Sequence, residues 1–238
     1  MQAEDVRDYP GIFISFEGGE GAGKSTHLRF LAKALEEHGQ SVLQLREPGG
    51  TAIGEALREV VLDPAYAQMS DRAELLIYEA ARAQIVAECI LPALREGKVV
   101  LCDRFTDSTL AYQVFGRGLD RSFVEVANAF AMQGVQPQRT VLMLTGGTAA
   151  TGLQRATKHT AADRLELEGD AFHTRVNDGF LQLAREFPER IRRVVSNETK
   201  SATAREVFAA LADLFPWMRG VLDDRAFFAE LDKPKSQV

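Results

Sequence analysis

A glycine-rich octapeptide near the N-terminus carries residue types that can bind a polyphosphate. Residues 18–25 read Gly-Gly-Glu-Gly-Ala-Gly-Lys-Ser and match the pattern G-x-x-x-x-G-K-[ST]. In this pattern backbone N–H groups turn inward around the phosphates, and the following helix adds the positive end of its dipole. We expect Lys24 to reach the β- and γ-phosphates and the Ser25 hydroxyl to hold Mg²⁺. An apolar run at residues 12–16 and a helical pattern at residues 24–37 supply the context that distinguishes this motif from a chance glycine-rich turn.

Three arginines indicate a second anionic ligand that faces the first. Arg46 and Arg104 follow two expected strands, and Arg82 lies on a long helical stretch that faces the same edge. Taken singly, each fits a surface ion pair, which usually contributes little to stability. Their shared position favours a common site, because guanidinium groups bind phosphate through two hydrogen bonds at once.

A phosphate-binding loop alone is compatible with an ATPase, a GTPase, a motor or a kinase. The chain has no N-K-x-D segment that reads guanine, and no apolar strand ends in paired carboxylates that could polarise water. Because phosphoryl transfer between two nucleotides needs two facing phosphate sites, the arginines favour a kinase.

The composition indicates an acidic chain with room for one large core. It has 238 residues, 45% of them hydrophobic, and a formal net charge of −6. This charge gives no general attraction to nucleic acid or anionic membranes. Cys89 and Cys102 lie in apolar segments, as reduced core thiols do, and the histidines form no ligand cluster. No segment approaches the about 18 apolar residues of a membrane span. We expect a cytoplasmic protein, with neither a nucleic-acid polymer nor a membrane as partner.

Short apolar runs alternate with helical patterns along the chain. The runs lie at residues 12–16, 41–45, 98–102, 140–144 and 191–195. Helical patterns lie at residues 24–37, 51–62, 72–94, 123–132, 171–186 and 202–215. This alternation predicts an α/β fold in which helices cover both faces of a parallel sheet. Ligands of such sheets bind beyond the carboxyl ends of the strands, where the candidate residues fall.

The chain divides into three expected segments. Residues 1–10 are a polar N-terminal tail, residues 11–215 carry the alternating pattern, and residues 216–238 are a C-terminal tail of unknown role. The C-terminal tail leaves a pair of alternatives open: docking of the Phe227–Phe228 pair on the body, or a loosely ordered terminus.

Four segments, in order, match one known family. They read FEGGEGAGKST at residues 16–26, REPGGT at 46–51, LLIYEAARAQ at 75–84, and DRF with STLAYQ across 103–113. Over residues 11–215 the chain resembles the thymidylate kinases (dTMP kinases), which are nucleoside monophosphate kinases. The resemblance implies a P-loop NTPase fold with a five-stranded parallel sheet, helices on both faces and a small helical lid at about residues 146–168.

The resemblance also implies a reaction and partners. The chain is expected to phosphorylate dTMP to dTDP with ATP and Mg²⁺, a step of dTTP synthesis, and to form a homodimer. Residues 73–94 are a possible packing surface for that dimer, although the same apolar stripe fits a monomer's core. The residues expected to bind ATP are Gly18, Gly19, Glu20, Gly21, Ala22, Gly23, Lys24, Ser25 and Thr26.

Residues that match the family's phosphate, sugar and metal contacts follow the first three strands. By resemblance, Glu20 contacts the 3′-hydroxyl of dTMP, while Arg46 and Arg104 hold the acceptor phosphate. Asp103 would organise Mg²⁺ together with Ser25; read from the sequence alone, it could instead cap the next helix.

Four further positions match the residues that read the base. By resemblance, Tyr78 stacks on thymine and Arg82 hydrogen-bonds its O4. Thr109 and Gln113 would read the base edge around N3. On periodicity alone, Tyr78 also fits ordinary core packing.

The chain departs from the family pattern at the lid. Gly21 stands where many members carry a P-loop arginine, and members without that arginine usually have an arginine-dense lid. Here the expected lid holds only Arg155, Lys158 and Arg164, and residues 145–148 replace the usual acidic-plus-proline turn. Arg155 is the expected catalytic lid residue, beside Lys24, Asp103 and Arg104. Two alternatives remain: a related deoxynucleotide kinase with another acceptor, and a catalytically weak nucleotide-binding paralogue.

Overall fold

One parallel sheet organises the molecule. The structure, a computed structural model, describes residues 9–146, 162–196 and 199–233. Its five strands lie in the order β2-β3-β1-β4-β5, and every neighbouring pair is parallel. The strands are β1 (Ile12–Glu17), β2 (Val42–Arg46), β3 (Val99–Asp103), β4 (Arg139–Leu144) and β5 (Ile191–Val195). The predicted α/β fold and five-stranded parallel sheet are confirmed.

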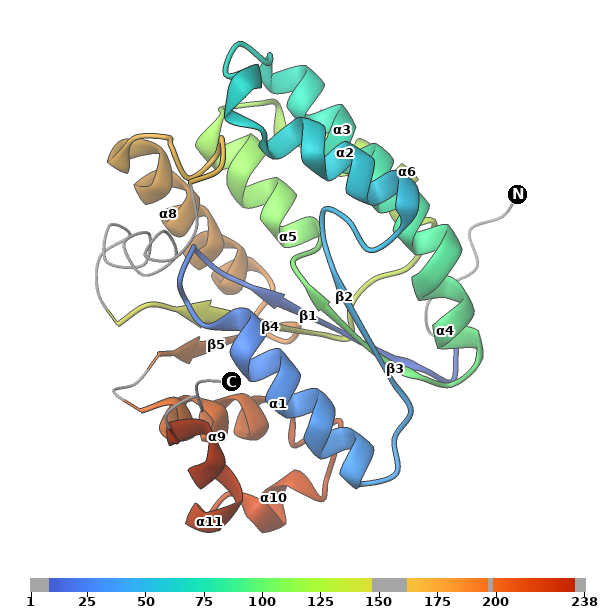
Figure 1. Ribbon diagram of the computed structural model, residues 1–238, viewed down its shortest axis with the longest axis vertical. Coiled ribbons are helices and arrows are strands. Elements are labelled where there is room, and N and C mark those ends of the chain that lie inside the picture. Colours follow the sequence, from blue (N-terminus) through green and yellow to red (C-terminus); the bar gives the residue numbers. More distant parts are fainter. Residues whose placement is uncertain (1–8, 147–161, 197–198, 234–238) are drawn as a thin grey trace.

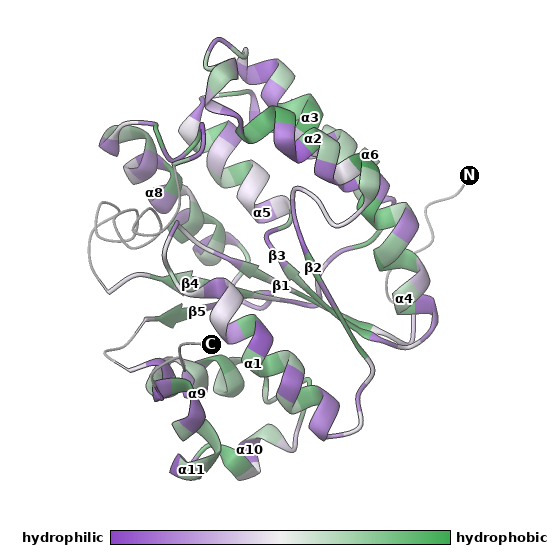
Figure 2. Cartoon of the chain, in the orientation of Figure 1, coloured by the Kyte–Doolittle hydropathy of each residue, from purple (hydrophilic) through white to green (hydrophobic). Residues whose placement is uncertain are grey.

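Helices cover both faces of the sheet (Figure 1). Along β1, Ile14 and Phe16 pack in the cluster that contains α1 (Lys24–Glu37) and α9 (Lys200–Leu211), whereas Phe13 belongs to the cluster on the other face. Successive side chains of a strand point to opposite faces, so a strand buried on both sides needs apolar residues throughout. Figure 2 shows this pattern in the central strand β3, which is mostly green, between helices with mixed green and purple faces.

The second face is also covered by helices, some of which carry base-reading residues of the predicted site. They are α2 (Ala52–Leu62), α3 (Asp71–Ile85), α4 (Leu91–Arg95), α5 (Thr106–Thr109), α6 (Arg121–Met132) and α8 (Asp170–Glu186), with the short η2 (Pro64–Tyr66) after α2. Thr51, Ser70 and Asp120 cap α2, α3 and α6 through their side chains, which accept backbone N–H groups that the first turn leaves unpaired. None of the described helices has both the length and the apolar character that crossing a membrane requires.

Two helical segments differ from the sequence prediction. The helix expected over residues 72–94 is interrupted by a π-helical turn, η3 (Val86–Ile90), just before Pro92 of α4. Because proline has no N–H to donate to the preceding turn, the backbone there adopts a wider spacing. In addition, no helix was expected at residues 106–116, where the structure has α5 and the π-helical η4 (Leu110–Gly116).

Described residues of the C-terminal tail dock on the body. They form α10 (Met218–Val221), α11 (Arg225–Phe228) and η5 (Ala229–Asp232), which lie against α1 and α9 (Figure 1). Phe228 is fully buried, and Trp217 stacks on His38 with ring centroids 3.6 Å apart. Of the two alternatives for this tail, docking is therefore the one observed for residues 216–233.

Candidate active site

The phosphate-binding loop connects β1 to α1 at the carboxyl edge of the sheet. Gly18 has a φ of 129°, and a Cβ there would lie 2.1 Å from the carbonyl oxygen of Met143, so only glycine fits this close approach. Lys24 is 7% exposed, and its Nζ donates to the carbonyl oxygens of Gly18 at 3.1 Å and Gly19 at 3.0 Å. Burial and the charge of Arg104 both lower the pKa of Lys24. The ammonium group is thus held within the loop.

Ser25 and Asp103 approach each other from α1 and the end of β3. The Ser25 hydroxyl donates to Oδ2 of Asp103 over 2.6 Å. Both residues line one cavity together with Lys24, Arg46 and Arg104. Among the described residues, no group of three or more histidine, cysteine or carboxylate side chains could hold a metal by itself. The pair fits Mg²⁺, which takes hard oxygen ligands and is commonly held by one or two protein groups together with substrate phosphates.

Arg104 adopts a backbone conformation that is rare for residues other than glycine. Its φ is 74°, and this geometry is held because its N–H donates to the Phe16 carbonyl at 2.9 Å and the next N–H, that of Phe105, donates to Oε1 of Glu17 at 2.7 Å. Glu17 is fully buried, and burial with the nearby charge of Asp107 raises its pKa to about 8. Strain of this kind persists where surrounding contacts hold it, and it clusters at functional sites.

The Arg104 guanidinium joins the loop to the next cavity. It donates to the Gly18 carbonyl at 3.1 Å, to the Tyr112 hydroxyl at 3.2 Å and to the Glu20 carboxylate. Burial alone raises the pKa of Glu20, but the charges of Arg104 and Lys24 outweigh it and hold that pKa at about 2. Glu20 is therefore an ionised acceptor at the mouth of the phosphate loop.

A second cavity collects most of the predicted dTMP-binding residues. Six of the seven line it: Glu20, Tyr78, Arg82, Arg104, Thr109 and Gln113. Arg46 lies in the neighbouring cavity of the phosphate loop, half exposed, with NH2 2.8 Å from Oε2 of Glu55. Glu20 and Arg104 line both cavities, so the two spaces adjoin.

Comparison with known proteins assigns the chain to a family. The family model described as thymidylate kinase matches residues 16–207. The thymidylate kinase of Trichlorobacter lovleyi is 50% identical over 185 residues, which cover 75% of this chain and 86% of that protein. The thymidylate kinase of Pelotomaculum thermopropionicum is 46% identical over 204 residues, covering 86% and 94%. The chain belongs to the thymidylate kinase family.

A solved structure of the thymidylate kinase family agrees with this assignment. The crystal structure of thymidylate kinase from Ehrlichia chaffeensis aligns with a TM-score of 0.69 at 31% identity, covering 84% of this chain and 98% of that chain. The predicted family, fold and enzyme class, a nucleotide kinase, are confirmed.

Arg82 lies at the floor of the second cavity of this thymidylate kinase fold. Its Nε and NH2 donate to Oε2 of Glu47 at 2.9 and 2.6 Å, and its NH1 lies 3.0 Å from Oε1 of Glu79 and 2.8 Å from Oγ1 of Thr109. Two buried carboxylates share this one cation, and burial raises the pKa of Glu47 to about 7. NH1 also donates to Oδ1 of Asn128 at 2.7 Å, so the bonds to these residues leave one N–H of NH2 for a ligand.

Several residues of the site were missed by the sequence prediction. Arg58 of α2 lines both cavities and donates to the Pro48 carbonyl at 2.9 Å. Tyr112, whose hydroxyl contacts Glu20, lies inside a thymidylate kinase motif in which only its neighbours were assigned roles. The sequence therefore contained a signal for Tyr112. It contained none for Arg58, because nothing local distinguishes this arginine from the other polar residues of its helix.

The expected lid of the thymidylate kinase fold is only partly described. Arg155 and Lys158 lie outside the described residues. Arg164, one of the three cations of the expected lid, lies 2.6 Å from Oε2 of Glu74 on α3. Folding thus brings a fully buried carboxylate, 90 positions away in the sequence, to this guanidinium.

Proposed function

We propose that this chain transfers the γ-phosphoryl group of ATP to dTMP, giving ADP and dTDP, with Mg²⁺ at the donor phosphates. One observation carries the proposal beyond family membership: a phosphate-loop cavity and a base-sized cavity adjoin, and Arg104 and Glu20 line both. Two nucleotides in these cavities would meet at their phosphates, as in-line transfer requires.

The donor half of the site is the P-loop, residues 18–26. Its backbone N–H groups would bind the β- and γ-phosphates of ATP, and Lys24 would leave its carbonyl partners to neutralise the transferring group. Ser25 and Asp103 would hold Mg²⁺, which when bound neutralises developing charge on the phosphates.

The acceptor half lies against the ends of β2 and β3. Arg46 and Arg104 would hold the dTMP phosphate, for which a guanidinium supplies two parallel hydrogen bonds. Glu20 stays ionised because of its low pKa, so it can accept a hydrogen bond from the sugar 3′-hydroxyl.

The base would lie between Tyr78 and the polar floor of its cavity. Tyr78 offers an aromatic face, and Arg82 would offer the second N–H of its NH2 group to the O4 atom of thymine. Thr109 and Gln113 line the same cavity at the edge proposed for N3. Such polar groups reject a mismatched base because they stay unpaired when it binds.

The chemistry needs no general base from the protein. A phosphate oxygen of dTMP is already a nucleophile at neutral pH, so the residues act by alignment, charge neutralisation and exclusion of water. We further propose that the lid at about residues 146–168 closes over ATP and that Arg155 contacts the transferring group. The catalytic domain would be residues 11–215, with residues 216–233 packed against it.

An acceptor panel tests the proposal. ADP release is measured with ATP and Mg²⁺ against dTMP, dUMP, dCMP, dGMP and dAMP. We expect dTMP to be preferred, with dUMP several-fold weaker because the methyl contact is worth about 1 kcal/mol, and the others at least about hundredfold weaker. Preference for another monophosphate would assign a related kinase with that acceptor. Nucleotide binding without turnover would assign a catalytically inactive paralogue.

We also propose that the chain forms a homodimer through α6 and its neighbours. Phe123, Val126 and Phe130 follow one another along α6 at helical spacing and are 57%, 68% and 85% exposed. Leu76 of α3 is 56% exposed and lines a groove with Phe123. The apolar face thus centres on α6 and includes only some of residues 73–94. Contiguous exposed apolar side chains of this kind mark interaction surfaces.

A charge on this face should dissociate the dimer. Phe130→Asp is expected to elute at the mass of a single chain in size exclusion with light scattering, because an unpaired carboxylate is costly to bury. Val195→Asp, at another exposed apolar position, serves as the matched control and should leave the mass unchanged. A monomeric wild type, or a dimeric Phe130→Asp, would contradict this surface.

A further inference from the structure

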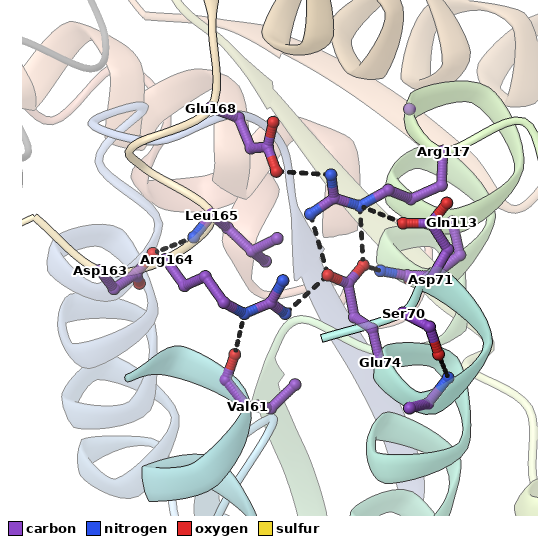
Figure 3. A network of polar contacts seen from close by, with 12 residues as sticks. Val61, Ser70, Asp71, Glu74, Gln113, Arg117, Asp163, Arg164, Leu165 and Glu168 are labelled. Carbon is purple, nitrogen blue, oxygen red and sulfur yellow. Dashed lines mark hydrogen bonds and ion pairs between the residues drawn. The ribbon is translucent and has the colours of Figure 1, made fainter. Parts of the chain in front are cut away.

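Glu74 of α3 lies at the centre of a buried polar network (Figure 3). Through Gln113 this network adjoins the second cavity, called the base cavity below because the base is proposed to bind there. Its side chain is fully buried, yet it accepts hydrogen bonds from three other residues. Gln113 Nε2 donates to Oε1 at 2.9 Å, Arg117 donates through Nε at 3.1 Å and NH2 at 2.9 Å, and Arg164 NH2 donates to Oε2 at 2.6 Å. Both carboxylate oxygens are thus engaged by donors.

Glu74 remains ionised in this network. Burial by itself would raise its pKa, but hydrogen bonds from Arg117 and Gln113, with the charge of Arg117, hold that pKa below the usual value of 4.5. A buried carboxylate flanked by two arginines acts only as an acceptor. Its neighbours must therefore present donors to it.

This requirement orients the amide of Gln113. A side-chain amide has one donor end and one acceptor end. Turning Oε1 toward Glu74 would set a carbonyl oxygen against a carboxylate, so Nε2 must face Glu74 and Oε1 must point away from it. Among the described residues, none donates a hydrogen bond to this Oε1. Gln113 lines the base cavity with Tyr78 and Thr109, whereas Glu74 does not.

We propose that Glu74 is a positioning residue for base selection: it locks the Gln113 amide so that its Oε1 offers an acceptor to the ring N–H of a thymine base. The inference rests on the proposed function and deepens it. Thymine and uracil carry a hydrogen on N3, whereas N3 of cytosine is an acceptor. A locked acceptor therefore favours the first two bases and repels the third.

Arg117 and Arg164 belong to the same network but do different work. Arg164 also donates through Nε to the Val61 carbonyl at 2.9 Å, and its own N–H donates to Leu62 at 2.9 Å, which fixes the cavity wall to the end of α2. Arg117 binds Glu74 on one side and Glu168 on the other. Neither arginine hydrogen-bonds to Gln113. Because lysine keeps the positive charge beside Glu74, Arg117→Lys is a control that removes hydrogen bonds to Glu74 but keeps it ionised and keeps its contact with Gln113.

The test compares selectivity across four variants: Glu74→Gln, Gln113→Met, the double variant and Arg117→Lys. The readout is the ratio of kcat/KM for dTMP to kcat/KM for dCMP, with the Kd of each nucleotide measured by calorimetry without ATP. In Glu74→Gln a neutral amide accepts either end of Gln113, so the ratio should fall about tenfold or more, mainly through KM and Kd. Gln113→Met should lower it similarly, and the double variant no further. Arg117→Lys should lower the melting temperature and keep the ratio.

A merely structural Glu74 would give a different pattern. Its loss would lower stability and reduce activity on dTMP and dCMP in equal proportion, leaving the ratio at the wild-type value; that result overturns the proposal. An unchanged ratio in Gln113→Met overturns it as well. If Glu74→Gln does not fold, Glu74→Asp replaces it. The shorter aspartate keeps a negative charge for the arginines but moves the carboxylate away from Gln113. A fall in the dTMP/dCMP ratio then supports the proposal, and an unchanged ratio overturns it. If the wild type neither binds nor phosphorylates dTMP, the proposed function itself is refuted. If the wild type prefers dTMP over dCMP but Arg117→Lys loses that preference, only this inference is refuted.

Discussion

Replacement of Lys24 by methionine is expected to lower kcat at least about hundredfold, since one preorganised charge at a transition state is worth about 3–4 kcal/mol. Methionine keeps the length and apolar stem of the side chain but removes the ammonium. That group lies 3.1 and 3.0 Å from the carbonyl oxygens of Gly18 and Gly19, within the loop proposed to bind the donor phosphates. Steady-state kinetics with ATP and dTMP measure the effect.

A second lysine on α1 provides the matched control. Lys33 is exposed and pairs with Glu230 at 2.8 Å, on the side of the helix that faces the C-terminal segment. Lys33→Met should keep kcat and KM near the wild-type values. Near-normal turnover in Lys24→Met, with folding intact by circular dichroism, would show that this loop is not the donor site.

Removal of the Arg104 guanidinium is expected to have the largest effect at the acceptor. Arg104→Met should lower kcat/KM for dTMP about a thousandfold, because it removes a two-pronged phosphate contact and leaves the partly buried charge of Glu20 without its main partner. The kcat/KM of Arg104→Lys should lie between those of the wild type and Arg104→Met, since an ammonium group keeps the charge but cannot make two parallel hydrogen bonds to the phosphate. Arg121→Met, at a partly exposed arginine paired with Glu125 and Glu186, is the control.

The pH profile separates the electrostatic role of Arg104 from a packing role. In the wild type the pKa of Glu20 is about 2, below its ordinary 4.5, so Glu20 stays charged throughout the neutral and mildly acidic range. Its contribution to stability is present above about pH 4.5 and is lost as the pH falls toward 2. Without Arg104, burial raises the pKa of Glu20, so Arg104→Met should lose further activity between neutral and mildly acidic pH. A variant profile parallel to that of the wild type would contradict this electrostatic account.

Much of the fold follows from local sequence patterns. The strand β5 and the helix α1 have the bounds that the sequence predicts, because apolar runs and helical periodicity are short-range signals. The π-helical interruption at residues 86–90 was missed because it depends on a single residue, Pro92, whereas the apolar periodicity of the helix continues through the segment. Helical residues 106–116 were missed because their side chains, such as Asp107 and Gln113, are polar yet buried, which hides the usual period.

The candidate residues themselves could be chosen from the sequence, because motif letters record which chemistry is available at each strand end. Their arrangement required the fold. Arg82 and Glu47 are separated by 35 positions and Glu74 and Gln113 by 39, and no local rule links them.

The sequence by itself determined the phosphate loop, the parallel sheet and the set of polar side chains that follow its strands, since each depends on neighbours within a few turns of chain. Only the tertiary structure decided how those side chains are oriented. The left-handed backbone of Arg104 is held by Glu17, and the amide of Gln113 is turned by Glu74, a residue that two arginines keep ionised. These orientations depend on contacts between buried charged groups that are far apart in the sequence. Because the dielectric constant of the interior is low, each unpaired charge there is costly, and local sequence does not show which charges will be paired.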